Sequence, residues 1–318
     1  MVQFLDFEKP LLDLQAKVEE LRAAEASGAD IAEKDIAGEI DRLEIRMARV
    51  ARLLYRDLSP VQIMQVARHP ERPQGADYVK ALVEGFVPLA GDRRYGDDQA
   101  MLAGVGKWLG QTPCVVCAID KGKTTAERIA RNFGMPKPEG YRKAQRLMRM
   151  ADRLGLPIVT LVDTPGAYPG VDAEERGQGQ AIAESLDVLM QVKVPVVSVI
   201  TGEGGSGGAL ALAAADRVLM LEHGIYSVIS PEGCAAILWK EANKDTIHAA
   251  ATALKLTAKD LLEHKVIDGI IDEPVGGAQR DAALAMKRVG KAVAAQLAEV
   301  AKANGGAEAR RGRFLGIL

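Results

Sequence analysis

The sequence predicts an α/β fold built mainly from parallel strands. Five short runs of β-branched and other apolar residues recur after residue 113, with helical patterns between most of them, as in parallel strands joined by crossover helices. One run leads into a glycine-rich segment and then into strong helix formers. Hydrophobic residues make up 48% of the 318 residues but aromatic residues only 4%, so we expect a core of small side chains in close backbone contact.

Residues 1–58 are predicted to form a helical hairpin, distinct from a main domain at 59–318. Their apolar residues are spaced alternately three and four apart, as in a heptad seam on two helices, with a turn at 27–30. These residues are Leu11, Leu14, Val18 and Leu21, then Ile36, Ile40, Leu43, Met47, Val50 and Leu54. The hairpin either folds onto its own domain or is a docking arm for a partner. Both interpretations stay open, because two short helices rarely bury enough surface alone.

The main domain begins with a helix whose N-cap is Ser59 and whose first residue is Pro60. The charged segment 90–98 contains three aspartates; a solvated turn is favoured there over a cation site. The strand-like runs are 114–119, 157–162, 194–200, 218–221 and 225–229. Because only a turn separates the last two, the order is closer to a repeated strand-strand-helix unit than to strict alternation.

Two further helices are predicted, at 139–154 and 279–302. The first has an apolar stripe and a second stripe of arginines, Arg142, Arg146, Arg149 and Arg153, and Gly155 ends it. An arginine stripe is usually a solvated face, but this one could also hold a nucleotide phosphate, coenzyme A or a partner. The polar tail 304–313 is expected to be loosely held and to carry no catalytic role.

The glycine-rich segment is the strongest functional signal. Residues 194–200 are strand-like, 202–208 contain five glycines, and 209–215 are helix formers. The first amides of a helix have no internal partners and carry the positive end of its dipole, and glycine lets a ligand approach them closely. The segment therefore predicts a socket for negative charge, either a phosphate or an oxyanion that forms during a reaction.

Several short motifs match only in part. Gly122, Lys123 and Thr124 resemble the end of a phosphate-binding loop, but Cys117 stands where its first glycine should be, so we do not expect a GTPase. Gly202, Gly204 and Gly207 fit a dinucleotide fingerprint, which normally follows the first strand of its domain; here several strands come earlier.

The best rival is a serine hydrolase. Gly204, Ser206 and Gly208 satisfy the nucleophile-elbow pattern, and either Asp245 with His248 or Asp260 with His264 would give the downstream acid and base. Glycine on every side of Ser206 is unusual for such an elbow. The pair Cys114 and Cys117 lacks a second pair and is expected in the core, so no metal site is predicted.

Composition excludes other classes. The net charge of −2 argues against a nucleic-acid binder, and no apolar run approaches the ~20 residues that span a bilayer. The acidic N-terminus does not resemble a secretion signal. Three cysteines, an odd number, indicate free thiols and a cytoplasmic location.

Taken together, these stretches resemble the alpha subunits of bacterial acetyl-CoA carboxylase carboxyltransferases. The matching segments cover nearly the whole chain and are long, ordered motifs. They are residues 4–8, 132–136, 139–144, 163–170, 202–209, 227–235 and 273–278. The resemblance implies a crotonase-type (ClpP/crotonase-like) superhelix of repeated strand-strand-helix units, and an active site shared with a beta subunit of the same fold in an α2β2 assembly.

The resemblance also implies the reaction. A carboxyl group moves from carboxybiotin, presented by a biotin carboxyl carrier protein and supplied by biotin carboxylase, to acetyl-CoA, and the malonyl-CoA product feeds fatty-acid synthesis. No cofactor is expected to be permanently bound, and the zinc of the family is expected on the beta subunit only. The acetyl-CoA thioester oxygen is held mainly by that subunit.

The residues agree with this chemistry. Loss of the carboxyl group leaves negative charge on the ureido oxygen of biotin, and backbone amides can stabilise it without any titratable side chain. We expect Gly207 and Gly208 to be the amide donors and Gly204 and Gly205 to shape the approach. The walls of the biotin site are expected to be Thr164, Gly166, Ala167, Tyr168 and Pro169.

Overall fold

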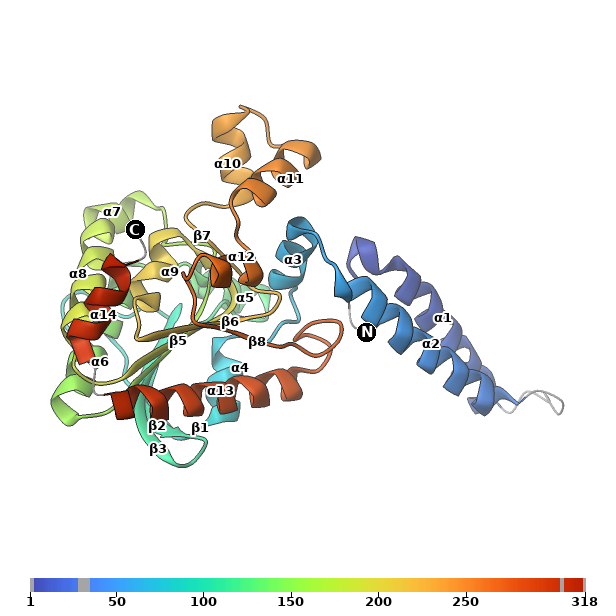
Figure 1. Ribbon diagram of the computed structural model, residues 1–318, viewed down its shortest axis with the longest axis horizontal. Coiled ribbons are helices and arrows are strands. Elements are labelled where there is room, and N and C mark those ends of the chain that lie inside the picture. The colour runs from blue at the N-terminus through green and yellow to red at the C-terminus, as the bar shows by residue number, and fades with distance from the viewer. Residues whose placement is uncertain (1–2, 28–34, 304–305, 317–318) are drawn as a thin grey trace.

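An eight-stranded mixed sheet forms the centre of the molecule (Figure 1). The computed structural model describes residues 3–27, 35–303 and 306–316. The strand order is β1-β2-β3-β4-β5-β6-β8, and β7 pairs with the C-terminal end of β5. The strands are β1 (Val83–Pro88), β2 (Met101–Trp108), β3 (Thr112–Ile119), β4 (Ile158–Thr164), β5 (Val196–Gly205), β6 (Arg217–Leu221), β7 (Ile225–Ser227) and β8 (Gly269–Ile271).

The expected parallel strands form one side of this sheet. β3, β4, β5, β6 and β8 are mutually parallel, and all five predicted runs become strands. The sequence interpretation missed β1, β2 and β8. β1 and β2 are antiparallel to their neighbours, β1 is a mostly exposed edge strand with a register shift between Glu84 and Val87, and β8 has only three residues.

Helices cover both faces of the sheet, and the side chains of β3 alternate between the two cores that result. Cys114 and Val116 point to one core, packed against α4 (Gly75–Leu82) and α13 (Ala282–Ala303). Val115 and Cys117 point to the other core. That second core is closed by α6 (Pro138–Leu154), α8 (Gln178–Gln191) and α9 (Ser206–Ala213). This alternation gives a three-layer α/β/α body.

The predicted N-terminal hairpin is present and projects from the body (Figure 1). It consists of α1 (Lys9–Ala26) and α2 (Ile36–Arg56), which share a small core around Val18, Ile40 and Leu43. Most of the predicted turn lies outside the described residues. At its base, Glu8 accepts hydrogen bonds of 2.9 Å from the Tyr55 hydroxyl and of 2.9 Å from Arg280 on the body. The boundary at residue 58 stays a prediction.

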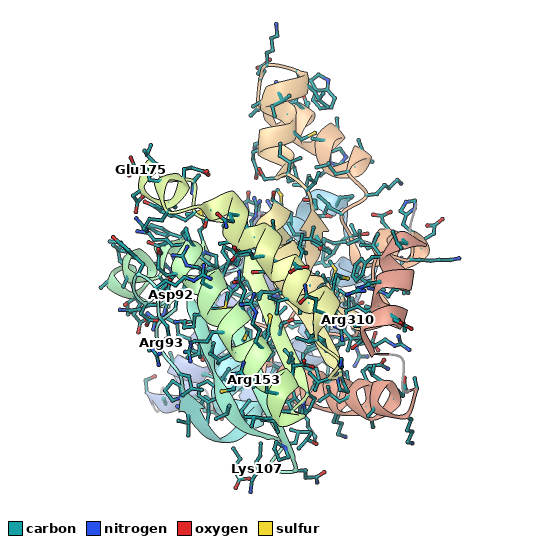
Figure 2. The ribbon with its side chains drawn as sticks, turned by 90° about the vertical axis from the view of Figure 1, so that its left-hand side faces the viewer. Asp92, Arg93, Lys107, Arg153, Glu175 and Arg310 are labelled. Carbon is teal, nitrogen blue, oxygen red and sulfur yellow. The ribbon has the colours of Figure 1, made fainter. Side chains whose placement is uncertain are left out.

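The C-terminal tail is not loosely held, contrary to the sequence expectation. Residues Gly306–Leu315 form helix α14, which packs against α8. Arg310 is buried and donates to both carboxylate oxygens of Asp216, and also to main-chain carbonyls of the α8–β5 connection (Figure 2). The tail is attached to the body by a buried arginine whose hydrogen bonds are all made within the protein, rather than by apolar side chains. Its sequence therefore contains many polar residues although it is firmly held.

The remaining helices of the described residues are short. They are α3 (Pro60–Ala67), α5 (Thr125–Ala130), α7 (Val171–Glu175), α10 (Pro231–Leu238), α11 (Lys244–Ala253) and α12 (Ala258–Glu263), with 3-10 turns at Asp6–Glu8 and Asn132–Gly134. Ser59 caps α3 by accepting the Gln62 amide, as predicted. Among the described helices, none is long and apolar enough to cross a bilayer.

Candidate active site

The two loops singled out in the sequence meet at the carboxyl ends of β4 and β5. These strands are parallel, and Thr164 at the end of β4 pairs with Gly204 near the end of β5. The glycine segment differs from the expectation in one respect, because Gly202–Gly205 belong to β5 rather than to a turn. Pairing with β7 prolongs the strand, since Gly204 lies opposite Tyr226.

Close backbone approach explains why glycine occupies these positions. A Cβ atom on Gly205 would collide with the Pro165 carbonyl, and one on Gly208 would lie 2.5 Å from the Ala167 nitrogen. Gly207 differs, because the nearest atom to a Cβ there is a methyl carbon of Ile182 at 3.4 Å. Gly205 and Gly208 therefore allow the backbones of the two loops to pack closely, whereas Gly207 faces more open space.

A sharp backbone turn separates β5 from α9. Ser206 has a φ of 52°, in the left-handed region, and α9 begins at this residue. The first amides of a helix lack intrahelical acceptors. Among the described residues, no side chain and no loop carbonyl accepts the amide of Gly207 or Gly208. Gly207 is half-buried and Gly208 is buried.

The β4 loop is held in shape by its own polar groups. The Thr164 hydroxyl accepts the Gly166 amide at 3.0 Å and donates to the Gly166 carbonyl at 2.7 Å. The Tyr168 amide donates to the Pro136 carbonyl at 3.1 Å, and Lys137 lies over the Tyr168 ring. Ala167 and Tyr168 are half-buried and Pro169 is exposed, so part of this wall is open to solvent.

An apolar groove opens beside the start of α9. Its volume is about 310 Å³, and Ser206 and Gly207 lie at its edge. The other lining residues are Leu210, Tyr226, Ser227, Val228, Leu254, Leu261 and Val266. The groove thus places hydrophobic walls next to the amides at the start of the helix. Most of these residues were missed in the sequence, because they come from four separate elements.

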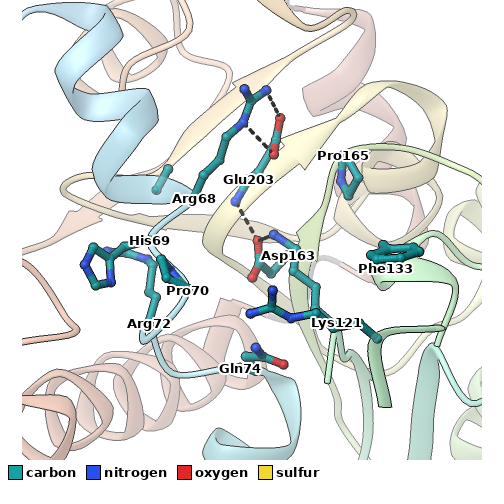
Figure 3. Close-up of a pocket in the computed structure, with 12 residues that line it drawn as sticks. Arg68, His69, Pro70, Arg72, Gln74, Lys121, Phe133, Asp163, Pro165 and Glu203 are labelled. Carbon is teal, nitrogen blue, oxygen red and sulfur yellow. Dashed lines mark hydrogen bonds and ion pairs between the residues drawn. The ribbon is translucent and has the colours of Figure 1, made fainter. Parts of the chain in front are cut away.

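A polar cluster lies at the same strand ends (Figure 3). Asp163 accepts the Glu203 amide at 2.8 Å and the Lys121 ammonium group at 2.6 Å. Arg68 bridges Glu203 and Glu232 through contacts of 2.6 and 2.7 Å. This cluster borders a cavity of about 210 Å³. Arg68 and Lys121 are each paired with a carboxylate. We therefore interpret the cluster as a structural one that stabilises the strand ends.

Comparison with known proteins decides the family. The family described as "Acetyl co-enzyme A carboxylase carboxyltransferase-like" matches residues 4–317. The chain is 57% identical over 298 residues to the acetyl-coenzyme A carboxylase carboxyl transferase subunit alpha of Paracoccus denitrificans, covering 94% of this chain and 92% of the relative. The subunit of the same name from Ruegeria pomeroyi is 54% identical, with 100% and 98% covered.

The chain belongs to the acetyl-CoA carboxylase carboxyltransferase family, alpha subunits. It is therefore one subunit of a multi-subunit carboxyltransferase.

Solved structures of low sequence identity share the fold of this carboxyltransferase subunit. A Pseudomonas malonate decarboxylase hetero-tetramer in complex with coenzyme A gives a TM-score of 0.58 at 18% identity, covering 75% of this chain and 94% of that one. Transcarboxylase 12S gives 0.56 at 20% identity, with 73% and 45% covered. The expected crotonase-type fold is confirmed.

The serine-hydrolase alternative is wrong. The family is one of carboxyltransferases, and among the described residues neither proposed base lies beside Ser206. His248 lies within α11 and His264 at the end of α12, where its amide bonds to the Asp260 carbonyl. Neither histidine lines the groove beside Ser206. Gly205 and Gly208, on either side of this serine, allow the close contact between the two loops.

The arginine stripe on α6 of this subunit has two half-buried members and two exposed ones. Arg142 bonds to Asp92 at 2.8 Å and Arg146 donates to carbonyls of residues 89–91, whereas Arg149 and Arg153 are exposed. The solvated turn predicted at 90–98 is found only in part. Residues 93–95 and 97 are exposed, whereas Asp92 and Asp98 are buried and accept main-chain amides. Among the described residues, no cluster of His, Cys, Asp or Glu is arranged to hold a metal ion.

Proposed function

We propose that this chain supplies the carboxybiotin-binding half of a carboxyltransferase active site, completed by a beta subunit. The complex would transfer a carboxyl group from carboxybiotin on a carrier protein to acetyl-CoA and form malonyl-CoA. The observation that carries this proposal is the contact between Gly208 and the loop at Gly166 and Ala167, which places helix-start amides beside an apolar groove.

The residues of this chain have distinct parts in the proposed chemistry. The amides of Gly207 and Gly208 donate hydrogen bonds to the ureido oxygen as the N–CO₂ bond of carboxybiotin breaks. Gly204 and Gly205 allow the close approach, and the loop from Thr164 to Pro169 forms one wall of the site. Tyr168 contributes the largest side chain of that wall, at half burial.

No protein base is needed in this scheme. The ureido oxygen takes the proton from the acetyl methyl group, and the resulting enolate attacks the released CO₂ to form the new C–C bond. The protein excludes water and stabilises the developing charge. This agrees with a site in which glycines and apolar side chains predominate and no histidine lines the groove.

The proposal extends to the assembly. Acetyl-CoA would be held mainly by the beta subunit, which would also carry the zinc, and the two subunits would form an α2β2 complex in the cytoplasm. Biotin carboxylase would recharge the carrier protein. No permanently bound cofactor is proposed for this chain. The hairpin at residues 1–58 would dock the partner, and the body at 59–318 would hold the site.

The test is reconstitution from purified components. The chain alone, the beta subunit alone and the mixture are assayed for malonyl-CoA formation from acetyl-CoA and carboxybiotin carrier protein. Activity is expected only in the mixture. Full activity of the isolated chain, or none in a mixture shown to be associated by light scattering, would reject the proposal.

A further inference from the structure

The side of α2 that faces away from the hairpin core is unusually basic. The core side of this helix carries Ile40, Leu43 and Met47. The opposite side carries three arginines spaced three residues apart, which places them on one face of the helix. We define the arginine face as Ile45, Arg46, Arg49, Arg52 and Leu53, all of which are exposed.

The charges on this face are not neutralised within the described part of the chain. Arginines at the two ends of α2 have partners there: Arg42 lies 3.1 Å from Glu39, and Arg56 lies 2.8 Å from Asp57. Arg46, Arg49 and Arg52 form no ion pair among the described residues. From residue 45 to residue 56 the helix contains four arginines and no acid.

Two large apolar side chains lie among these arginines. Ile45 is 71% exposed and Leu53 is 54% exposed. They are eight residues apart, which is about 12 Å along a helix, so a second helix lying along α2 would cover both. The hairpin core does not use them. The face therefore combines two apolar side chains with three neighbouring arginines, a combination that is common in protein interfaces.

The surroundings favour an acidic protein segment over a membrane or RNA. Acidic side chains are exposed on the rest of the hairpin, at Asp13, Glu19, Glu20, Asp41 and Glu44. They would be repelled by an extended polyanionic surface, but a single helix bound along the arginine face would not meet most of them. Two apolar residues are also too few to insert a helix stably into lipid.

The hairpin is held firmly enough to present this face at a defined place. Tyr55, in the last turn of α2, bonds to Glu8, and Glu8 also pairs with Arg280 of the body. The Tyr55 ring packs against Phe7 and, edge-on, against His223. A partner bound to the strand-end loops can therefore contact the arm as well.

We infer that the arginine face docks an acidic helical segment of the partner beta subunit. This inference rests on the proposed function and specifies one contact of that assembly. It predicts that three arginines and two apolar residues far from the glycine amides contribute to the stability of the complex, and that their contribution falls as the salt concentration rises.

The experiment measures the dissociation constant of the full-length chain for the purified beta subunit at 50 and 300 mM NaCl. The test variant is Arg46→Glu/Arg49→Glu/Arg52→Glu. The control variant Lys287→Glu/Lys291→Glu/Lys302→Glu changes the net charge equally on exposed positions of α13. A third variant, Ile45→Ser/Leu53→Ser, removes only the apolar anchors. Circular dichroism and thermal unfolding check that all variants fold.

The arginine variant is expected to bind about tenfold or more weakly at 50 mM NaCl, with a smaller difference at 300 mM, and the control to bind as the unmodified chain does. The Ile45→Ser/Leu53→Ser variant is expected to bind more weakly at both salt concentrations. Equal affinity of all variants would overturn the inference and leave the proposed function intact. Failure of the unmodified chain to bind the beta subunit would instead reject the proposed function. Arginine-dependent binding to phosphatidylglycerol vesicles or to single-stranded RNA, without an effect on beta-subunit binding, would also overturn the inference.

Discussion

Arg310 in the C-terminal helix donates two hydrogen bonds to Asp216, one of 3.0 Å from Nε to Oδ1 and one of 2.7 Å from Nη2 to Oδ2. Asp216 in turn accepts the amide of Val196, the first residue of β5, at 2.8 Å. The last helix of the chain is thereby tied to the start of the strand that ends in the glycine site.

Replacement of Arg310 is expected to destabilise the protein strongly. Arg310→Ala leaves the Asp216 carboxylate in a buried position without its cation, which costs about 3–5 kcal/mol of unfolding free energy. Arg311→Ala is the matched control, because Arg311 is exposed and should cost less than about 1 kcal/mol. Urea unfolding followed by circular dichroism compares them, and similar losses in both would show that the ion pair does not anchor the helix.

The two glycines at the start of α9 are expected to differ in their tolerance of a methyl group. In Gly208→Ala the new Cβ would lie 2.5 Å from the backbone of the 166–167 loop, so the loops must separate, and carboxyl transfer should fall about 100-fold. In Gly207→Ala the Cβ has ordinary contacts, and activity should stay near that of the unmodified complex. The assay is malonyl-CoA formation with the beta subunit. Equal tolerance at both positions would contradict the tight contact.

Asp92 gives a pH-dependent contribution to stability. Burial opposes its ionisation, but amide hydrogen bonds from Tyr95, Arg94 and Gly96 and the guanidinium of Arg142 outweigh it and lower its pKa to about 2. A carboxyl whose pKa is lower in the folded state stabilises the fold above its ordinary pKa near 4. That contribution is lost as the pH falls toward 2.

The corresponding test uses Asp92→Asn, which keeps the shape but loses the charge. At pH 7 the variant should unfold with about 2 kcal/mol less free energy. This difference should be almost unchanged at pH 5, begin to narrow at pH 3.5 and narrow further as the pH falls toward 2. Asp41→Asn, at an exposed position, should show almost no gap. A gap for Asp92→Asn that is constant with pH would mean that packing, rather than charge, is responsible.

The cysteines of β3 are expected to be unreactive in the folded chain. Burial raises the pKa of the Cys114 thiol to about 11 and that of Cys117 to about 12, so almost no thiolate exists at pH 8. A thiol-reactive disulfide reagent should therefore label at most Cys234 in the native protein and all three cysteines after unfolding. Rapid labelling of either remaining thiol in native Cys234→Ser would contradict the burial of this strand.

Much of the fold was predictable because its signals are local. The strand runs of β3 to β7, the Ser59 cap and the helix ending at Gly155 follow from hydrophobic pattern and capping chemistry within a few residues. β1 was missed because an exposed, irregular edge strand has no buried face to create a pattern. The burial of Arg310 was missed because its partner lies 94 residues earlier in the chain.

The glycine segment of the site could be predicted from the sequence, but the residues that line the groove and the polar cluster could not. Clustered glycines mark Gly204 to Gly208 directly, since only a close approach of chains explains so many together. The predicted end of β5, residue 200, falls short of its observed end at Gly205. Pairing with β7 prolongs the strand, and the β7 residues lie 22 positions later in the chain. The groove walls and the Asp163 cluster come from several separate elements, so no single stretch of sequence displays them.

The irregular edge strand β1 also limits how this chain can associate. One end of the sheet is a strand broken by a bulge and closed by Pro88, and the other is the three-residue β8. Neither offers a long row of free backbone groups on which a foreign strand could be added. Growth of the sheet from molecule to molecule, the route to fibrils, is therefore disfavoured at both ends, and we expect oligomers of this chain to be joined through helices and loops.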